Sequence, residues 1–201
     1  MESTSHNILS LSGIVSSDIE FSHESHGVSF YSFKIETRRL SGTSDIINAL
    51  VSETLLSECG FGKGDFITTK SELRSFNQKN ENGSKLIISA FLKEVSVSED
   101  ENFENELTLT GTICKKPVYR KTPLGREICD IMLAINRRYR RSDYIPLVTW
   151  GRNARIADTY DTGDVITISG RVQSREYTKV IDGEEIIKTA YEVSVSSIEA
   201  V

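Results

Sequence analysis

The sequence predicts an all-β protein of two similar domains, each a five-stranded barrel with one short helix. Two observations lead to this prediction. Apolar and polar residues alternate over much of the chain, which is the period of a half-buried strand. A degenerate repeat also recurs after about 99 residues. A repeat of that length is too long for a solenoid unit, and 201 residues leave room for two domains of about 100 each.

Three short segments recur in the same order in both halves of the chain. NILSLSG at residues 7–13 matches NELTLTG at 105–111, IETRR at 35–39 matches AINRR at 134–138, and GDFI at 64–67 matches GDVI at 163–166. A polar, acidic stretch separates the two copies. We therefore predict a first domain over residues 1–98, a linker over 99–105 and a second domain over 106–201.

Alternation predicts the strands of each unit. The first strand of each copy presents one apolar face, which holds Leu9, Leu11, Gly13 and Val15 or Leu107, Leu109, Gly111 and Ile113. Ile131, Leu133 and Ile135 continue this pattern in the next strand of the second copy. From 165 to 177 the even positions hold Ile166, Ile168, Gly170 and Val172, which are expected in the core, whereas the odd positions form an open face that includes Arg171, Arg175 and Tyr177. Each copy ends in a further strand, over Lys85–Val97 or Ile186–Val195.

One helix is predicted in each unit, over Ser52–Cys59 and Asn153–Tyr160. Asn153 is a favourable N-cap residue, and Gly60 and Gly163 stand where the chain must turn back. Five strands with a helix between the third and the fourth describe an OB-fold barrel. A small sandwich has a similar number of strands, so the pattern alone leaves both open.

Charge is distributed unevenly along the chain. The net charge of −5 conceals −7 over residues 1–104, +7 over 105–157 and −5 over 158–201. Between Arg137 and Arg155, six arginines surround two tyrosines and the single tryptophan, Trp150. Arginines bind a phosphate backbone and aromatic faces stack on unpaired bases, so this stretch indicates single-stranded nucleic acid. The alternative is that Trp150 lies in the core and the arginines only solvate a hairpin.

Other function classes find little support. No apolar run is long enough to span a membrane, and the N-terminus lacks the pattern of a secretory signal, so a cytoplasmic protein is expected. Three cysteines without paired spacing fit reduced thiols, and the three histidines lack a fourth ligand for zinc. We find no catalytic motif and expect neither an enzyme nor a bound cofactor or metal.

The second half resembles the bacterial single-stranded DNA-binding protein family. The resemblance rests on NELTLTGTICKKPVYRKTPLGREICDIMLAINRRY at residues 105–139, which contains the pattern P-x-x-R-x-T-x-x-G. It continues through DYIPLVTWGRNA, GDVITISGRVQSREYTK and YEVSV. Residues 7–97 look like the same fold without its functional motifs, since SHESHG stands where the pattern P-x-x-R-x-T-x-x-G would be.

The resemblance implies two groups of binding residues. Bases would stack on Tyr139, Tyr144, Trp150 and Tyr177. The arginines of the central cluster would pair with phosphates or stack through their planar guanidinium groups: Arg137, Arg138, Arg140, Arg141 and Arg152. Arg120, Lys121 and Arg126 would extend the groove, and Arg171 and Arg175 would contribute from the strand face that holds Tyr177. Tyrosine at positions where the family often has tryptophan should stack less strongly.

The resemblance also implies a role in DNA replication, recombination or repair, and a homodimer that presents four OB-folds. Family members usually end in a disordered linker with an acidic tip, whereas this sequence ends directly after its last predicted strand. Replication or repair proteins are therefore expected to dock on a folded surface. The first domain is expected to serve assembly or partner binding. A primosomal-type adaptor, an RNA-binding OB module and an OB-fold enzyme are the alternatives.

Overall fold

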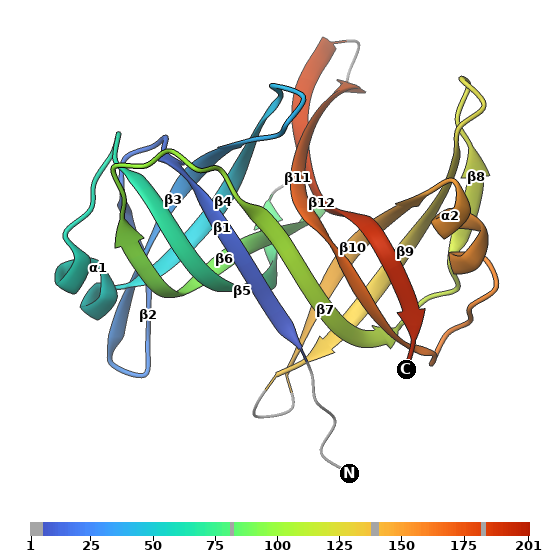
Figure 1. Cartoon of the computed structure of the whole chain (residues 1–201), viewed down its shortest axis with the longest axis horizontal. Helices are drawn as coiled ribbons and strands as arrows, with labels where there is room; N and C mark the ends of the chain where they lie inside the picture. The colour runs from blue at the N-terminus through green and yellow to red at the C-terminus, as the bar shows by residue number, and fades with distance from the viewer. Residues whose placement is uncertain (1–5, 81–82, 138–140, 182–183) are drawn as a thin grey trace.

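The computed structural model describes residues 6–80, 83–137, 141–181 and 184–201, and shows two β-barrels side by side (Figure 1). The elements of the first barrel are β1 (Asn7–Val15), β2 (Glu20–Ser25), β3 (Val28–Arg38), β4 (Ser44–Ser52), α1 (Glu53–Cys59), β5 (Phe66–Asn80) and β6 (Gly83–Val97). Those of the second are β7 (Asn105–Ile113), β8 (Val118–Lys121), β9 (Glu127–Asn136), β10 (Ser142–Trp150), α2 (Arg152–Ala157), β11 (Val165–Ile181) and β12 (Glu184–Ala200).

Five strands close each barrel, and a short sixth strand lies at its edge. In the first barrel the order is β1-β5-β6-β4-β3, and β3 returns to pair with β1. In the second the order is β7-β11-β12-β10-β9, and β9 returns to β7. The alternation seen in the sequence directs Leu9, Leu11, Leu107 and Leu109 into the cores, where all four are buried.

A glycine marks the point where each barrel closes. A Cβ on Gly13 would lie 2.2 Å from the carbonyl oxygen of Glu36 in β3, and one on Gly111 would lie 2.5 Å from that of Ala134 in β9. Any side chain would therefore separate the first strand from its closing partner. This close approach explains why both copies of the repeat end their first segment in glycine.

The two barrels join into one sheet through their first strands. β1 pairs antiparallel with β7, from Asn7↔Leu109 to Leu11↔Asn105, with Leu9↔Leu107 at the centre. Because these pairs map onto themselves when the barrels are exchanged, the junction has approximate twofold symmetry. The asparagine that begins each repeat follows the same symmetry. The Asn7 side chain donates to the carbonyl of Leu73 and accepts from its amide, and the Asn105 side chain does the same with Val172.

The segment between the barrels packs on the first barrel. The hydroxyl of Ser12 donates to the carbonyl of Asn102 and accepts from the backbone amide of Glu104, at 2.6 Å in both cases. The ring of Phe103 meets that of Phe66 edge to face, with 5.1 Å between centroids, and Arg38 lies over Phe103. These contacts fix the path of the connection from β6 to β7.

The two helices differ in how well their ends were predicted. α1 begins after Ser52, whose side chain accepts from the amide of Leu55, and ends at Gly60 in the left-handed conformation. The prediction of Asn153 as the N-cap of α2 is wrong, because Gly151 occupies that position. The Asn153 side chain instead donates to the carbonyl of Ser196 in β12. α2 ends at Ala157, before the predicted Tyr160.

Candidate nucleic-acid interface

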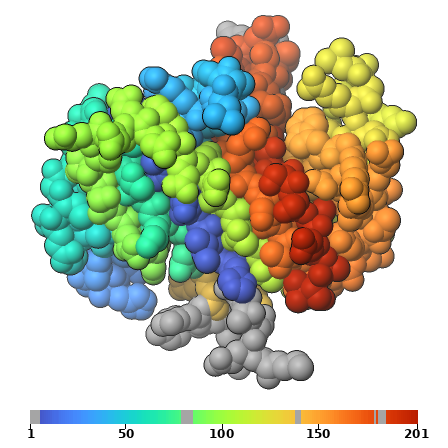
Figure 2. Space-filling model, in the orientation of Figure 1, coloured from blue at the N-terminus to red at the C-terminus, as the bar shows by residue number. Residues whose placement is uncertain are grey.

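A groove of about 570 Å³ surrounds Trp150 on the open face of the second barrel. We call it the Trp150 groove. Its lining residues are Arg126, Trp150, Arg171, Gln173, Ser174, Arg175 and Ser194, together with Arg39 and Thr43 of the first barrel. Figure 2 shows the light-blue β3–β4 hairpin, which carries Arg39 and Thr43, beside the orange strand β11. The first barrel therefore contributes to this groove.

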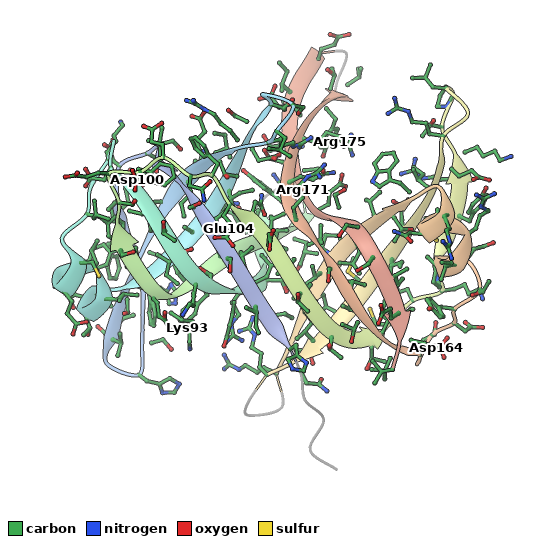
Figure 3. The ribbon with its side chains drawn as sticks, in the orientation of Figure 1. Lys93, Asp100, Glu104, Asp164, Arg171 and Arg175 are labelled. Carbon is green, nitrogen blue, oxygen red and sulfur yellow. The ribbon has the colours of Figure 1, made fainter. Side chains whose placement is uncertain are left out.

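Strand alternation positions the groove residues of the second barrel. Trp150 is the last residue of β10 and is 39% exposed, so it is not a core residue. Arg171 pairs in register with Ser194 of β12, and the next positions on that face of β11 hold Gln173, Arg175 and Tyr177. Figure 3 shows Arg171 and Arg175 following one another along β11. Of the predicted open face, Arg171, Arg175 and Tyr177 are exposed, whereas Gln173 between them is buried.

Arg175 and Tyr177 lie together further along β11. The Arg175 guanidinium is 5.8 Å from the centre of the Tyr177 ring, and its Nε is 3.8 Å from a carboxylate oxygen of Glu192. Glu192 also accepts a 2.9 Å hydrogen bond from Gln173. Tyr177 is 37% exposed, so a ring face is available for stacking next to a guanidinium.

The predicted arginines fall into two groups. Arg126, Arg141, Arg152 and Arg171 are exposed, and their side chains make no hydrogen bond or ion pair with the described residues. Arg120 instead forms a bidentate pair with Asp130, with Nε 2.7 Å from the carboxylate, and this hydrogen bond raises the pKa of Arg120. Only the arginines of the first group can contact a phosphate without breaking an existing ion pair. Arg138, Tyr139 and Arg140 lie outside the described residues.

Arg137 occupies the contact between the barrels. Its guanidinium forms a bidentate pair with the fully buried carboxylate of Asp143 and donates to the carbonyl of Ser75, at 3.1 Å, in the first barrel. Asp143 also accepts from the backbone amide of Ser75. These bonds assign Arg137 a structural role in this conformation.

Tyr144 lies near the same contact, away from the Trp150 groove. It is 46% exposed and shares a strand face with Trp150 by parity, but the two lie six positions apart along β10, or about 20 Å. The Tyr144 amide donates to the hydroxyl of Ser75 at 2.8 Å. The structure therefore places Trp150 in the groove at the end of β10 and leaves Tyr144 beside the first barrel.

An equivalent contact on the other side was not predicted from the sequence. Arg39 forms a bidentate pair with the fully buried Asp45, which accepts a 2.9 Å hydrogen bond from the amide of Ser174 in the second barrel. Arg39 and Arg137 thus have the same role at an offset of 98 residues, whereas the sequence match had paired Arg39 with Arg138. The sequence does contain a signal for this contact, because Asp45 and Asp143 stand at the same offset of 98 residues.

The described residues contain neither a cluster of metal ligands nor a membrane-spanning helix. Among them no three His, Cys, Asp or Glu side chains gather closely enough to hold a metal ion. Neither described helix has the length and apolar character to cross a bilayer, since α1 has 7 residues and α2 has 6.

Comparison with known proteins relates the second barrel to nucleic-acid binding proteins. The model of the single-strand binding protein family matches residues 104–201. Single-stranded DNA-binding protein 2 of Streptococcus agalactiae is 34% identical over 87 residues, which are 40% of this chain and 65% of that protein. Single-stranded DNA-binding protein A of Bacillus subtilis is 32% identical over 102 residues, or 47% of this chain and 58% of that protein. The chain spans less than two thirds of these relatives.

The similarity in fold extends to both barrels. The crystal structure of the wild-type single-stranded DNA binding protein from Thermus aquaticus matches with a TM-score of 0.76 and 17% sequence identity. The match covers 98% of this chain and 93% of that one. The predicted fold class, two tandem OB-fold barrels, is confirmed.

Proposed function

We propose that this chain, whose residues 104–201 match the model of the single-strand binding protein family, binds single-stranded DNA with little sequence preference. Binding would protect or organise the strand during replication, recombination or repair, in the cytoplasm and without catalysis. The Trp150 groove would hold the strand.

One observation carries the proposal: a half-exposed tryptophan lies in a groove beside two arginines without partners among the described residues. Trp150 offers a ring face to a base, and Arg126 and Arg171 line the same groove. Stacking on an aromatic side chain is worth roughly 1–3 kcal/mol per base and tolerates any sequence. Exposed arginines would gain phosphate contacts without breaking an ion pair. Both features suit a strand whose bases are unpaired.

Trp150 fluorescence provides the test, because this is the only tryptophan in the chain. Titration with oligo-dT should quench the emission, whereas a duplex of equal length should quench it far less. An RNA strand distinguishes a DNA binder from a general single-strand binder. Absence of quenching and of any anisotropy change with a labelled strand at low salt would reject the proposal.

We further propose that two chains associate and present four barrels, as the family resemblance implies. Light scattering should then give a mass near twice the 22.5 kDa of one chain. A mass of one chain at micromolar concentration, with and without oligo-dT, would contradict the dimer but not the proposed DNA binding.

A further inference from the structure

Strand β11 of the second barrel continues beyond the strand that supports one of its edges. β7 pairs with β11 only from Val165 to Gly170, whereas β12 pairs with it along almost its whole length. Among the described residues, no strand pairs with the β7-side edge of β11 after Gly170. In Figure 1 this segment extends beyond the barrel, next to the light-blue β3–β4 hairpin. It carries Arg171 and Arg175, which line the Trp150 groove, and Tyr177.

Side chains take the place of the missing strand at this edge. Backbone groups that lack a strand partner need other hydrogen bonds or water. The Asn105 side chain bonds to both the amide and the carbonyl of Val172. Two residues further on, the amide of Ser174 donates to the carboxylate of Asp45 in the first barrel, at 2.9 Å. No described residue bonds to this edge beyond Ser174, so Asp45 is its last support before the end of the β11–β12 hairpin.

The Asp45 carboxylate is held in a fixed orientation. It is fully buried, and the Arg39 guanidinium donates to both of its oxygens, at 2.7 and 2.6 Å. A second bond runs in the other direction, since the amide of Ile46 donates to the Ser174 hydroxyl at 3.0 Å. Two bonds from adjacent residues of β4 thus fix both the place and the direction of Ser174. Supporting bonds of this kind hold a binding side chain in its productive geometry.

Arg175 and Tyr177 depend on the backbone of β11 for their positions. Arg175 directly follows Ser174 in the chain and lines the Trp150 groove, and its guanidinium lies 5.8 Å from the centre of the Tyr177 ring. Both side chains are exposed, so core packing does not fix them. Release of Ser174 from the first barrel would let this part of β11 move and carry Arg175 away from Trp150, which lies on β10.

We propose that Asp45 of the first barrel is a positioning residue for the single-strand site of the second barrel. It holds β11 so that Arg175 lines the groove together with Trp150. The inference takes its ligand from the proposed function and deepens it. A site on the second barrel then depends on a first-barrel side chain that is fully buried and does not itself touch the strand.

Titration of Trp150 fluorescence with oligo-dT at several salt concentrations provides the test, because the single tryptophan reports on its own groove. Asp45→Ala should weaken binding by about 5- to 150-fold, the equivalent of one lost stack on Tyr177. It should also lower the slope of log affinity against log salt by about 0.7, the share of one phosphate contact. Arg175→Ala should lower the slope equally in the wild-type background and have no further effect in the Asp45→Ala background.

Asp143→Ala is the matched control. Asp143 is an equally buried carboxylate with an arginine partner and a backbone amide of the opposite barrel, but it holds Ser75 of β5 rather than β11. Asp143→Ala should lose stability as Asp45→Ala does and keep the wild-type affinity at Trp150. Asp45→Asn retains an acceptor oxygen for the Ser174 amide, so its salt slope should be at least as steep as that of the wild-type protein. Circular dichroism checks that each variant folds.

If Asp45→Ala has the affinity and salt slope of Asp143→Ala, or if its effect adds to that of Arg175→Ala, Asp45 has only a structural role and the inference is refuted, while the proposed function stands. If oligo-dT does not quench Trp150 in the wild-type protein, the proposed function fails and the inference with it. Hydrogen exchange of the wild-type protein decides the question if Asp45→Ala does not fold. The Ser174 amide should exchange as slowly as that of Val172, and exchange at the rate of an unbonded amide would overturn the inference.

Discussion

Asp45 and Asp143 hold the same position in the two barrels, and each accepts a hydrogen bond from a backbone amide of the opposite barrel. The donors are Ser174 for Asp45 and Ser75 for Asp143. Both carboxylates are fully buried, and each has a bidentate arginine partner in its own barrel. Burying a charge is costly unless it is paired and hydrogen-bonded, so these two clusters stabilise the contact between the barrels only while they are complete.

Arg137→Ala should therefore destabilise the protein. It leaves the buried Asp143 carboxylate without its main partner, and we expect the free energy of unfolding to fall by about 3 kcal/mol. Adding Asp143→Asn should recover part of this loss, because the unpaired charge is removed. Urea denaturation measures both variants. A loss below about 0.5 kcal/mol for Arg137→Ala, with a lower salt dependence of DNA binding, would instead favour a direct phosphate contact.

The free and the paired arginines should differ in how they affect DNA binding. Arg171→Ala removes an unpaired guanidinium from the Trp150 groove and should lower the salt slope of oligo-dT affinity by about 0.7. Arg120→Ala removes a side chain already paired with Asp130 and should change the slope less. Fluorescence titrations at several salt concentrations compare the two variants. Equal slopes would show that the pair with Asp130 opens on binding.

Gly111→Ala should disturb closure of the second barrel. The new methyl group would meet the Ala134 carbonyl and the Leu133 side chain, and such overpacking typically costs about 1–3 kcal/mol. Gly62→Ala is the matched control, since a Cβ there meets nothing within 4 Å. Thermal unfolding should show a lower midpoint for Gly111→Ala only. Equal unfolding midpoints for the two variants would mean that β7 and β9 can move apart without loss of stability.

Cys129 should make the protein less stable at alkaline pH. Burial raises the pKa of its thiol to about 11, from an ordinary value of 9.0. Below pH 9 the folded and the unfolded chain both keep this proton. Between about pH 9 and 11 the unfolded chain releases it first, so the free energy of unfolding falls as the pH rises. Cys129→Ala should remove this part of the slope, which urea titrations at several pH values would measure. If the free energy of unfolding of Cys129→Ala falls with pH as steeply as that of the wild-type protein, the Cys129 thiol is not the cause.

Local pattern predicted most of the fold. Alternation identified the strands because each has one face in a barrel core, and Ser52 and Gly60 marked the ends of α1 because both act within one turn of helix. Asn153 misled the prediction of α2 because a residue 43 positions away, Ser196, accepts its hydrogen bond. Such a contact has no signature in the local sequence.

The candidate sites were predicted less completely. Trp150 and Arg171 were predicted because each stands at a visible position in an alternating strand, and both line the same groove. A groove of about 2550 Å³ on the first barrel was overlooked, because the acidic sum over residues 1–104 hides its cations and because Arg141 reaches it from the other half of the chain. The ion pair of Arg137 likewise depends on Ser75, 62 residues earlier.

The pairing of β1 with β7 inside one chain has an evolutionary consequence. In a symmetric dimer of single barrels, every mutation occurs twice and alters both faces together. Here each barrel is encoded separately, yet they meet through Leu9↔Leu107 as two identical subunits would. A substitution can thus change one face while the other keeps its inherited contacts. Covalent duplication thus allows the two faces of a symmetric assembly to evolve different binding properties.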